Sequence, residues 1–463
     1  MKLATRSAAL ALALYLLVVG SHATAQAIVP NIIDPQVVLS TYHGGSGNEC
    51  INYRCSVAVD AQGYIYLSGT TSSSAFPLVN PLYALSNGVF VVKLTPGGGS
   101  VVYSTYLTRG DAQGLAVDAA GRAYVTGFTL DPAFPVTPNA LKSTPGGVDA
   151  FLAVLSADGQ QVVYGTYLGG SGRDEGYDVG VDKGGNIYLT GWTDSTNFPV
   201  KSAVQAASGG GRDAFLLRIN ANGTLGYSTY LGGAQDDRAW GIAVDDLGSA
   251  IIVGFTNSNN FPVTAGALQT VRYSGAGYDA LIARFRPDGQ RVYSTFFNKS
   301  STNAGIAVAT DGSGAAHVLM SKDGVMRLNP SGTAYTFWAK PQLEVDISGE
   351  GGIAVDAAGN TYAVGRFGPS ANKDFKLVAL DRRGQIVAER VWGGSAQDWA
   401  TDITVQTVDG CAATAFVTGT SLSANYPTTP GSLQPTSAGG ADAILKLLNP
   451  LPTCTVRMPL IRR

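Results

Sequence analysis

Three loops of this 463-residue chain carry charged side chains at spacings that could support chemistry. Two of them lie in near-identical stretches, YGTYLGGSGRDEGYDVGVD (164–182) and YSTYLGGAQDDRAWGIAVD (227–245). The candidate ligand-binding residues at the loop tips are Arg173, Asp174, Glu175, Asp236, Asp237, Arg238, Asp398 and Trp399. Two carboxylates can act as general acid and base on a polysaccharide when burial raises the pKa of one of them. Acidic, glycine-rich loops could instead hold calcium, although these loops lack the spacing of an EF-hand or a nonapeptide repeat.

A second candidate region is WAKPQLEVDISGEGG (338–352), which combines aromatic and acidic side chains. Its candidate ligand-binding residues are Trp338, Glu344, Asp346 and Glu350, with Lys340 beside them. Trp338 and Trp399 could each stack on a sugar ring, but packing in the core explains both rings as well. No catalytic residue is predicted, because the chain lacks GxSxG, HExxH and comparable signatures.

The near-identical stretches belong to a repeat that occurs seven times. Each copy has an apolar, β-branched run, a turn of the form Asp–x–x–Gly or a variant of it, and a second apolar run. The copies are 56–70, 114–128, 178–192, 241–255, 305–320, 352–366 and 402–420, of which 305–320 is degenerate. In each turn the aspartate is expected to cap the backbone and the glycine to supply a positive φ. These pairs are Asp60 with Gly63, Asp118 with Gly121, Asp182 with Gly185, Asp245 with Gly248, and Asp356 with Gly359.

A third and a fourth apolar run follow each hairpin after a longer connection. Four antiparallel strands about every 60 residues predict an all-β fold, a seven-bladed β-propeller of four-stranded antiparallel blades. The first strand of the mature chain, VVLSTYH (37–43), matches a fourth strand, and the last unit ends after its third strand at Asn449. The N-terminal strand is therefore predicted to complete the last blade, which closes the ring without a free edge.

These residues resemble the bacterial seven-bladed β-propeller repeat family (SBBP repeats). The resemblance lies in STYLGG, the GIAVD–x–x–GN hairpin, VTG, GGxDAF and the dipeptides Phe134–Pro135, Phe198–Pro199 and Phe261–Pro262. It covers roughly residues 37 to 449, with units 5 and 6 departing from the pattern. It implies an exported propeller, with no single activity and no fixed catalytic residues.

Loop lengths predict which face of the propeller carries function. The turns within each hairpin are short, whereas about 20 residues separate Gly127 from Asp149 and Gly191 from Asp213. These long connections and the crossings between blades share one face, and long loops usually carry function. Units 5 and 6 lack most of the long loop, so an open-sided cleft is expected there, beside 338–352. Repeat decay without function explains the same feature.

The N-terminus predicts export. Lys2 and Arg6 precede an apolar run, Ala8 to Gly20, and then SHATAQA, which has the small residues of a signal-peptidase site. The expected organisation is a signal peptide (1–27), the propeller (28–450) and a C-terminal tail (451–463), secreted or at the cell surface. A net charge of −2 gives no footprint for nucleic acid. No membrane span is expected after signal removal, and a monomer is expected.

Four cysteines, Cys50, Cys55, Cys411 and Cys454, are expected to form disulfides, because CxxC pairs and histidines at zinc-ligand spacing are both absent. Cys50 and Cys55 lie in one crossing loop on the long-loop face. Cys411 lies in a hairpin on the opposite face, and Cys454 follows a strand that runs towards that face. This geometry favours Cys50–Cys55 and Cys411–Cys454.

The predicted function is that of a non-enzymatic binding or scaffold module, whose partner is an extracellular glycan or protein held on the long-loop face. One alternative is a polysaccharide hydrolase or lyase that uses carboxylates at the channel mouth. Its candidates are Asp174, Glu175, Asp236, Asp237 and Glu350. The other alternative is a calcium-stabilised structural protein of the cell surface. No cofactor is expected, calcium is possible, and no metal ligand can be named.

Overall fold

The computed structural model describes residues 36–51, 54–273, 277–299, 302–345, 350–370, 372–408 and 412–452. The chain divides into two compact units, Met1–Ile32 and Ile33–Arg463. All described strands belong to the second unit. The expected signal peptide (1–27) lies outside the described residues, as does the tail beyond Pro452.

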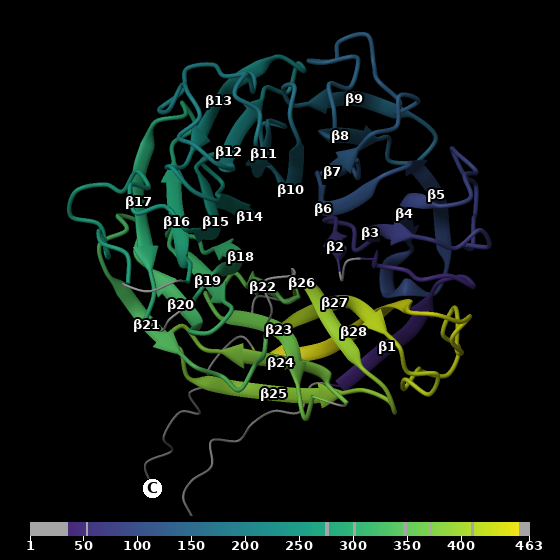
Figure 1. Cartoon of the computed structure of the whole chain (residues 1–463). Helices are drawn as coiled ribbons and strands as arrows, with labels where there is room; N and C mark the ends of the chain where they lie inside the picture. Colours follow the sequence, from purple (N-terminus) through teal and green to yellow (C-terminus); the bar gives the residue numbers. More distant parts are fainter. Residues whose placement is uncertain are drawn as a thin grey trace, which may run out of the picture. The chain divides into compact units, whose positions relative to one another are not determined.

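The described strands of this unit form seven antiparallel four-stranded sheets, here called blades 1 to 7 in chain order (Figure 1). The blades, each from inner to outer strand, are as follows. Blade 1 has β2 (Cys55–Val59), β3 (Ile65–Thr71), β4 (Gly88–Leu94) and β5 (Val101–Thr108), with a short 3-10 helix at Pro96–Gly98. Blade 2 has β6 (Asp111–Val117), β7 (Ala123–Thr129), β8 (Asp149–Leu155) and β9 (Val162–Leu168). Blade 3 has β10 (Asp174–Val181), β11 (Ile187–Thr193), β12 (Asp213–Ile219) and β13 (Leu225–Leu231).

Blade 4 has β14 (Asp237–Val244), β15 (Ala250–Thr256), β16 (Asp279–Phe285) and β17 (Arg291–Phe297). Blade 5 has β18 (Gly305–Thr310), β19 (Ala316–Met320), β20 (Gly324–Leu328) and β21 (Tyr335–Ala339). Blade 6 has β22 (Gly352–Val355), β23 (Thr361–Phe367), β24 (Asp374–Leu380) and β25 (Ile386–Trp392). Blade 7 has β26 (Asp398–Val408), β27 (Ala412–Ser421), β28 (Asp442–Pro452) and, as its outer strand, β1 (Gln36–His43).

The ring closes as the sequence predicts. Strand β1 pairs antiparallel with β28, from Gln36 opposite Asn449 to His43 opposite Ala443. The first strand of the propeller therefore completes the last blade, and Figure 1 shows purple β1 beside yellow β28. Strand β28 runs on to Pro452, two residues into the predicted tail.

The hairpin turns have the predicted chemistry. In blade 3, Asp182 Oδ1 accepts the backbone N–H groups of Gly184 and Asn186, each at 2.9 Å. Gly185 follows with a φ of 78°, a conformation that a side chain disfavours. The buried hydroxyl of Tyr188 donates to Asp182 Oδ2, so the turn aspartate also satisfies a polar group of the core. The aspartates are therefore structural.

The core lies between neighbouring blades. One cluster joins Tyr124 and Leu152 of blade 2 to Leu189 and Phe215 of blade 3, all buried. The phenylalanines of the Phe–Pro dipeptides are also buried, each against aromatic rings of its own blade. Phe134, for example, lies 5.2 Å from Phe151 and 5.1 Å from Tyr167 between ring centroids. Apolar burial of this kind is the main force that holds stacked repeats together.

Long connections and blade crossings meet on one face, as predicted. The long connection of blade 2 (130–148) meets the crossing into blade 3 where Asp174 donates its backbone N–H to the Val148 carbonyl, at 2.8 Å. The corresponding connections are much shorter in blade 5 (321–323) and blade 6 (368–373), so the long-loop face is less built up over these two blades. Within the described residues, no helix is long and apolar enough to cross a membrane.

Candidate functional site

The centre of the propeller is lined mainly by bulged residues of the inner strands. In five blades the pairing of the inner strand skips one residue, a β-bulge that leaves one side chain without a partner across the sheet. The bulged residues are Gln113, Tyr177, Trp240, Ile306 and Thr401. Together with Cys55 of blade 1 and Gly351 of blade 6, they line a central cavity of about 70 Å3. Each blade thus contributes at least one residue to the channel.

Two aspartates stand at the next position along these strands, where the other described blades have glycine, alanine or serine. Asp178 Oδ2 accepts the N–H of Ile242 in blade 4 at 2.9 Å, and its Oδ1 accepts that of Val179. Asp402 Oδ2 likewise accepts the N–H of Val57 in blade 1 at 2.9 Å. Each carboxylate therefore links the inner strands of two neighbouring blades.

Burial raises the pKa of both carboxyl groups. The pKa of Asp178 rises to about 6, although the N–H of Ile242 and the charge of Arg54 oppose the rise. The pKa of Asp402 rises to about 7, and the charge of Asp178 adds to the effect of burial. The two aspartates therefore interact through the cavity that they share.

Arg54 connects this cavity to a wider bowl at the channel mouth, because it lines both. Its guanidinium carbon lies 4.6 Å from the centre of the Tyr177 ring, a cation–π contact. Burial lowers the pKa of Arg54, and the nearby charges of Tyr177 and Asp178 oppose this. The guanidinium is thus a positive charge held at the entrance to the channel.

The bowl has a volume of about 370 Å3 and is rich in arginine. Its described lining residues are Arg54, Gln113, Phe128, Arg173, Glu175, Tyr177, Trp192, Arg212 and Arg238. Arg173 comes from the crossing into blade 3, Arg212 from the long connection of blade 3, and Arg238 from the start of β14. The bowl therefore lies on the long-loop face over blades 2 to 4.

Three of these arginines surround one tryptophan. The guanidinium carbons of Arg212, Arg238 and Arg173 lie 4.8, 5.0 and 6.0 Å from the centre of the Trp192 ring. Trp192 itself is buried and pairs across the sheet with Glu175. The ring thus forms a fixed base on which the cationic groups rest.

Two carboxylates partly neutralise the positive charge of the arginines. Glu175 Oε1 accepts Arg173 Nε at 2.6 Å, and Asp236 Oδ2 accepts Arg238 Nη2 at 2.9 Å and Arg212 Nη1 at 3.3 Å. Each guanidinium has five N–H donors, so each keeps several beyond its ion pair. The arginines therefore outnumber the carboxylates, and the bowl is cationic.

A second hollow of about 490 Å3 adjoins the bowl, since Phe128 and Arg173 line both. It extends over the rim of blade 2, between Arg109 and the long connection that contains Leu130. Leu130 is strongly exposed there. Together the two hollows form an extended depression that could hold a chain of several units.

The acidic residues predicted at the loop tips fall into two groups. Asp174, Asp237 and Asp398 are fully buried at the first position of an inner strand. Asp174 accepts hydrogen bonds from the N–H of Gly170 and the hydroxyls of Thr193 and Ser195, and the other two have the same kind of partners. These three acids are therefore parts of the architecture. They anchor the crossing loop to the blade.

The second group lies at the mouth. Glu175, Arg173, Arg238 and Asp236 are brought together by the ion pairs described above. Trp399 occupies the corresponding place in blade 7 but is buried.

The region 338–352 is largely engaged in contacts of its own. Trp338 Nε1 donates to the carbonyl of Asp323, and Lys340 Nζ lies 4.8 Å from the Trp338 ring centre. Glu344 pairs with Lys373 at the surface. Glu350 is buried and binds Arg366 with both oxygens, at 3.0 and 3.1 Å. Asp346 lies outside the described residues. A ligand at this region stays a prediction.

Several residues of the mouth escaped the sequence reasoning. They are Arg54, Gln113, Tyr177, Asp178, Arg212 and Asp402. A signal was present for Gln113 and Tyr177, because the position before each GIAVD-like run varies strongly among the copies. A position that varies inside an otherwise repeated strand indicates a side chain that faces the channel.

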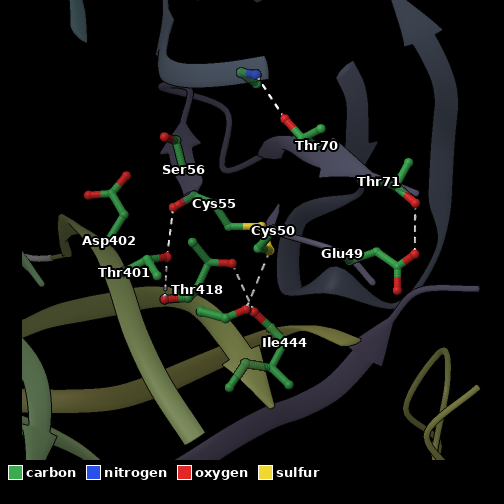
Figure 2. Close-up of a disulfide and its surroundings, with 12 residues drawn as sticks. Glu49, Cys50, Cys55, Ser56, Thr70, Thr71, Thr401, Asp402, Thr418 and Ile444 are labelled. Carbon is green, nitrogen blue, oxygen red and sulfur yellow. Dashed lines mark hydrogen bonds between the residues drawn. A yellow bond between two sulfur atoms is a disulfide. The ribbon is translucent and has the colours of Figure 1, made fainter. Parts of the chain in front are cut away.

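The disulfide Cys50–Cys55 is present as predicted, with 5.1 Å between the Cα atoms. Figure 2 shows it beside the closing blade, where Thr401 of β26 donates its hydroxyl to the Cys55 carbonyl at 2.8 Å. Cys50 Sγ lies 3.8 Å from the carbonyl of Gly419 in β27. The bridge thus fixes the segment before β2, which carries Arg54, against blade 7. Cys411 and Cys454 lie outside the described residues.

No group of three or more His, Cys, Asp or Glu side chains that could hold a metal ion occurs in the described part of the chain. The two carboxylates of the channel, Asp178 and Asp402, each accept two backbone N–H groups instead.

Seven four-stranded blades around a lined channel define the class as a seven-bladed β-propeller. A family model described as a β-propeller repeat (SBBP) matches residues 163–199 and 226–262. The chain therefore carries the SBBP β-propeller repeat at these two places, in agreement with the resemblance seen in the sequence. A search of curated proteins found no match.

Proposed function

We propose that this protein is a non-enzymatic binding module, exported to the cell surface or the medium, that holds an extracellular glycan or protein at the channel mouth. The observation that carries the proposal is the bowl of about 370 Å3, in which four arginines and three aromatic rings converge from separate strands and loops. Convergent polar groups in a well-formed depression are the usual mark of a binding site. A monomer suffices, because the bowl is built within one chain.

The mouth supports binding better than hydrolysis. The carboxyl groups with raised pKa, Asp178 and Asp402, line a cavity of only about 70 Å3, below the volume of an ordinary ligand pocket. Their oxygens are also engaged by backbone N–H groups. Glu175, the acid that reaches the bowl, is paired with Arg173.

The test is a thermal-shift screen of the protein against neutral glycans, acidic glycans and unstructured peptides, because a ligand of the native state raises the melting temperature. Each ligand found is then mapped by hydrogen exchange. The proposal expects slower exchange at 173–178, 209–213 and 236–240. Slower exchange confined to the hairpin turns at 182–186 and 245–249, on the opposite face, would contradict it. So would the absence of any stabilising ligand in all three sets.

A further inference from the structure

The charge of the bowl identifies the chemistry of its ligand. Four guanidinium groups face two carboxylates, those of Glu175 and Asp236. Arginine on an aromatic ring keeps its planar set of N–H donors, which match the two oxygens of a carboxylate. The lining therefore suits an anion with paired oxygens better than a neutral group.

Three buried atoms at the bowl have no partner in the described structure. Arg238 Nε and Trp192 Nε1 are donors, and Gln113 Oε1 is an acceptor on a side chain that is only 7% exposed. An unsatisfied buried polar atom is costly, so a ligand that offers partners to these atoms gains on binding. Such a ligand must offer an acceptor and a donor close together. A sugar acid does so, with its carboxylate and its ring hydroxyls.

The composition of the bowl also favours a sugar over an apolar peptide side chain. Its described lining consists of arginine, glutamine, glutamate and aromatic residues, without an aliphatic side chain. Phe128 and Tyr177 offer half-buried rings beside the polar groups. The adjoining hollow of about 490 Å3 then provides room for further units of a chain.

We propose that the bowl binds a uronate residue of an acidic polysaccharide, with Arg212, Arg238 and Arg173 around the carboxylate and Gln113 accepting a sugar hydroxyl. The adjoining hollow over blade 2 holds the next sugar units. This inference rests on the proposed function, because it specifies the ligand class of the same site.

The experiment compares the binding of two forms of one oligosaccharide by isothermal titration calorimetry. The probes are hexagalacturonate and the same hexamer with its carboxyl groups methyl-esterified, which keeps the sugars and removes the charge. We expect the free acid to bind at least tenfold more tightly. Arg212→Ala should weaken its binding at least tenfold, and Arg212→Lys should restore only part, since lysine keeps the charge but not the paired donors.

Arg122→Ala is the matched control. Arg122 is an arginine of similar exposure, 43% against 40% for Arg212, and it is also ion-paired with an aspartate, but in a hairpin turn of the opposite face. It should leave the affinity unchanged. The melting temperature of each variant, measured in parallel, shows that the protein is folded.

Other outcomes overturn the inference in distinguishable ways. Equal binding of the acid and its ester, still sensitive to Arg212→Ala, would reject an anionic ligand but keep the mouth as a binding site. Equally tight binding of hexaglutamate would reject the sugar and leave a carboxylate-binding site for acidic peptides. Hexagalacturonate binding that Arg122→Ala weakens as much as Arg212→Ala would reject the bowl. If hexagalacturonate does not bind, the inference fails, and the wider screen of glycans and peptides decides whether the proposed function survives.

Discussion

The carboxylate of Asp402 in blade 7 accepts the backbone N–H of Val57 in blade 1 at 2.9 Å, across the place where the ring closes. Asp178 makes the equivalent bond to Ile242 between blades 3 and 4. The strand pairing of β1 with β28 closes the outer edge of blade 7, and Asp402 joins blades 7 and 1 at the inner edge. Closure of the ring therefore depends on contacts at both the outer and the inner edge of the blades.

This carboxylate should make stability depend on pH in a defined direction. The pKa of Asp402 is raised to about 7 in the folded protein, so the folded state holds the proton more tightly than the unfolded chain does. Its contribution is fully present below the unfolded pKa of about 4 and is lost as pH rises towards 7. Asp402→Asn does not ionise, so its melting temperature relative to the wild type should rise between pH 4.5 and pH 8.

Asp246→Asn is the control for this measurement. Asp246 is exposed and pairs with the equally exposed Lys183 at the surface, so its loss reports the effect of one surface charge. A difference between Asp402→Asn and the wild type that is flat over this pH range would contradict the assignment. Asp178→Asn should show the same trend at somewhat lower pH, because the pKa of Asp178 is raised to about 6.

The disulfide should matter for both stability and the mouth. Replacing Cys50 and Cys55 by serine opens a short loop, and chain entropy for a separation of 5 residues predicts a loss of about 2 kcal/mol. The segment before β2 also loses its attachment near Arg54. We therefore expect a lower melting temperature and weaker binding of any ligand that Arg54→Ala also weakens. Unchanged stability in the double variant would show that packing against Thr401 and Gly419 alone holds the segment.

The fold could be read from the sequence because it is repeated. A hairpin such as GIAVDAAGNTYAVG (352–365) contains the strand residues, the turn aspartate and the turn glycine in one short segment, so each copy confirms the others. Even the degenerate blade 5 keeps its aspartate, Asp311, and its glycine, Gly314, with a φ of 74°. Local rules therefore sufficed for blade count, closure and the position of the long loops.

The site was only partly predictable, since it depends on contacts between repeats. Asp174 and Glu175 are adjacent in sequence, yet the first anchors a loop and the second faces the bowl, because successive residues of a strand point to opposite sides. Arg212 was overlooked because it lies before the repeated Asp213, in a connection whose course is not set by local pattern. Trp192 is a buried packing residue, but three arginines from other segments converge on it, which no local pattern indicates.

Close approach of two strands explains the glycine in the second strand of the blade 3 hairpin. At Gly191 an added Cβ would collide with the carbonyl of Glu175 in the paired strand and press on the ring of Phe215. Gly191→Ala should therefore destabilise the protein by about 3 kcal/mol, through overpacking and a shifted strand. It should also weaken binding at the mouth, because Glu175 moves with its carbonyl. Thermal denaturation and calorimetric titration check the two effects.

Gly312→Ala is the matched control for that variant. No atom outside its own neighbourhood lies within 4 Å of a Cβ at Gly312, and its backbone is not in the left-handed region. Its stability should stay within about 0.5 kcal/mol of the wild type. A Gly191→Ala variant as stable as Gly312→Ala would mean that β10 and β11 can separate without cost.

The degenerate blade 5 should be the most sensitive to loss of its turn aspartate. Asp311 Oδ2 accepts a hydrogen bond from Arg327 Nη2 at 2.6 Å and lies 3.1 Å from Nε2 of the buried His317. The equivalent aspartate of blade 3, Asp182, accepts hydrogen bonds from Asn186 and Tyr188 instead. Burial would raise the pKa of Asp311, but hydrogen bonds from His317, Ser313 and Arg327 hold it well below its usual range.

Asp311→Asn leaves the largely buried Arg327 without its charge partner, so we expect a loss of about 3 kcal/mol at pH 7. Asp182→Asn should cost less, because no cation is left unpaired. Since the pKa of Asp311 is lowered, its contribution is present above the unfolded pKa of about 4 and disappears as pH falls. The difference in melting temperature between Asp311→Asn and the wild type, measured by thermal denaturation from pH 7 to pH 3, should therefore become smaller as the pH falls. A gap that stays constant would assign the loss to packing rather than to the ion pair.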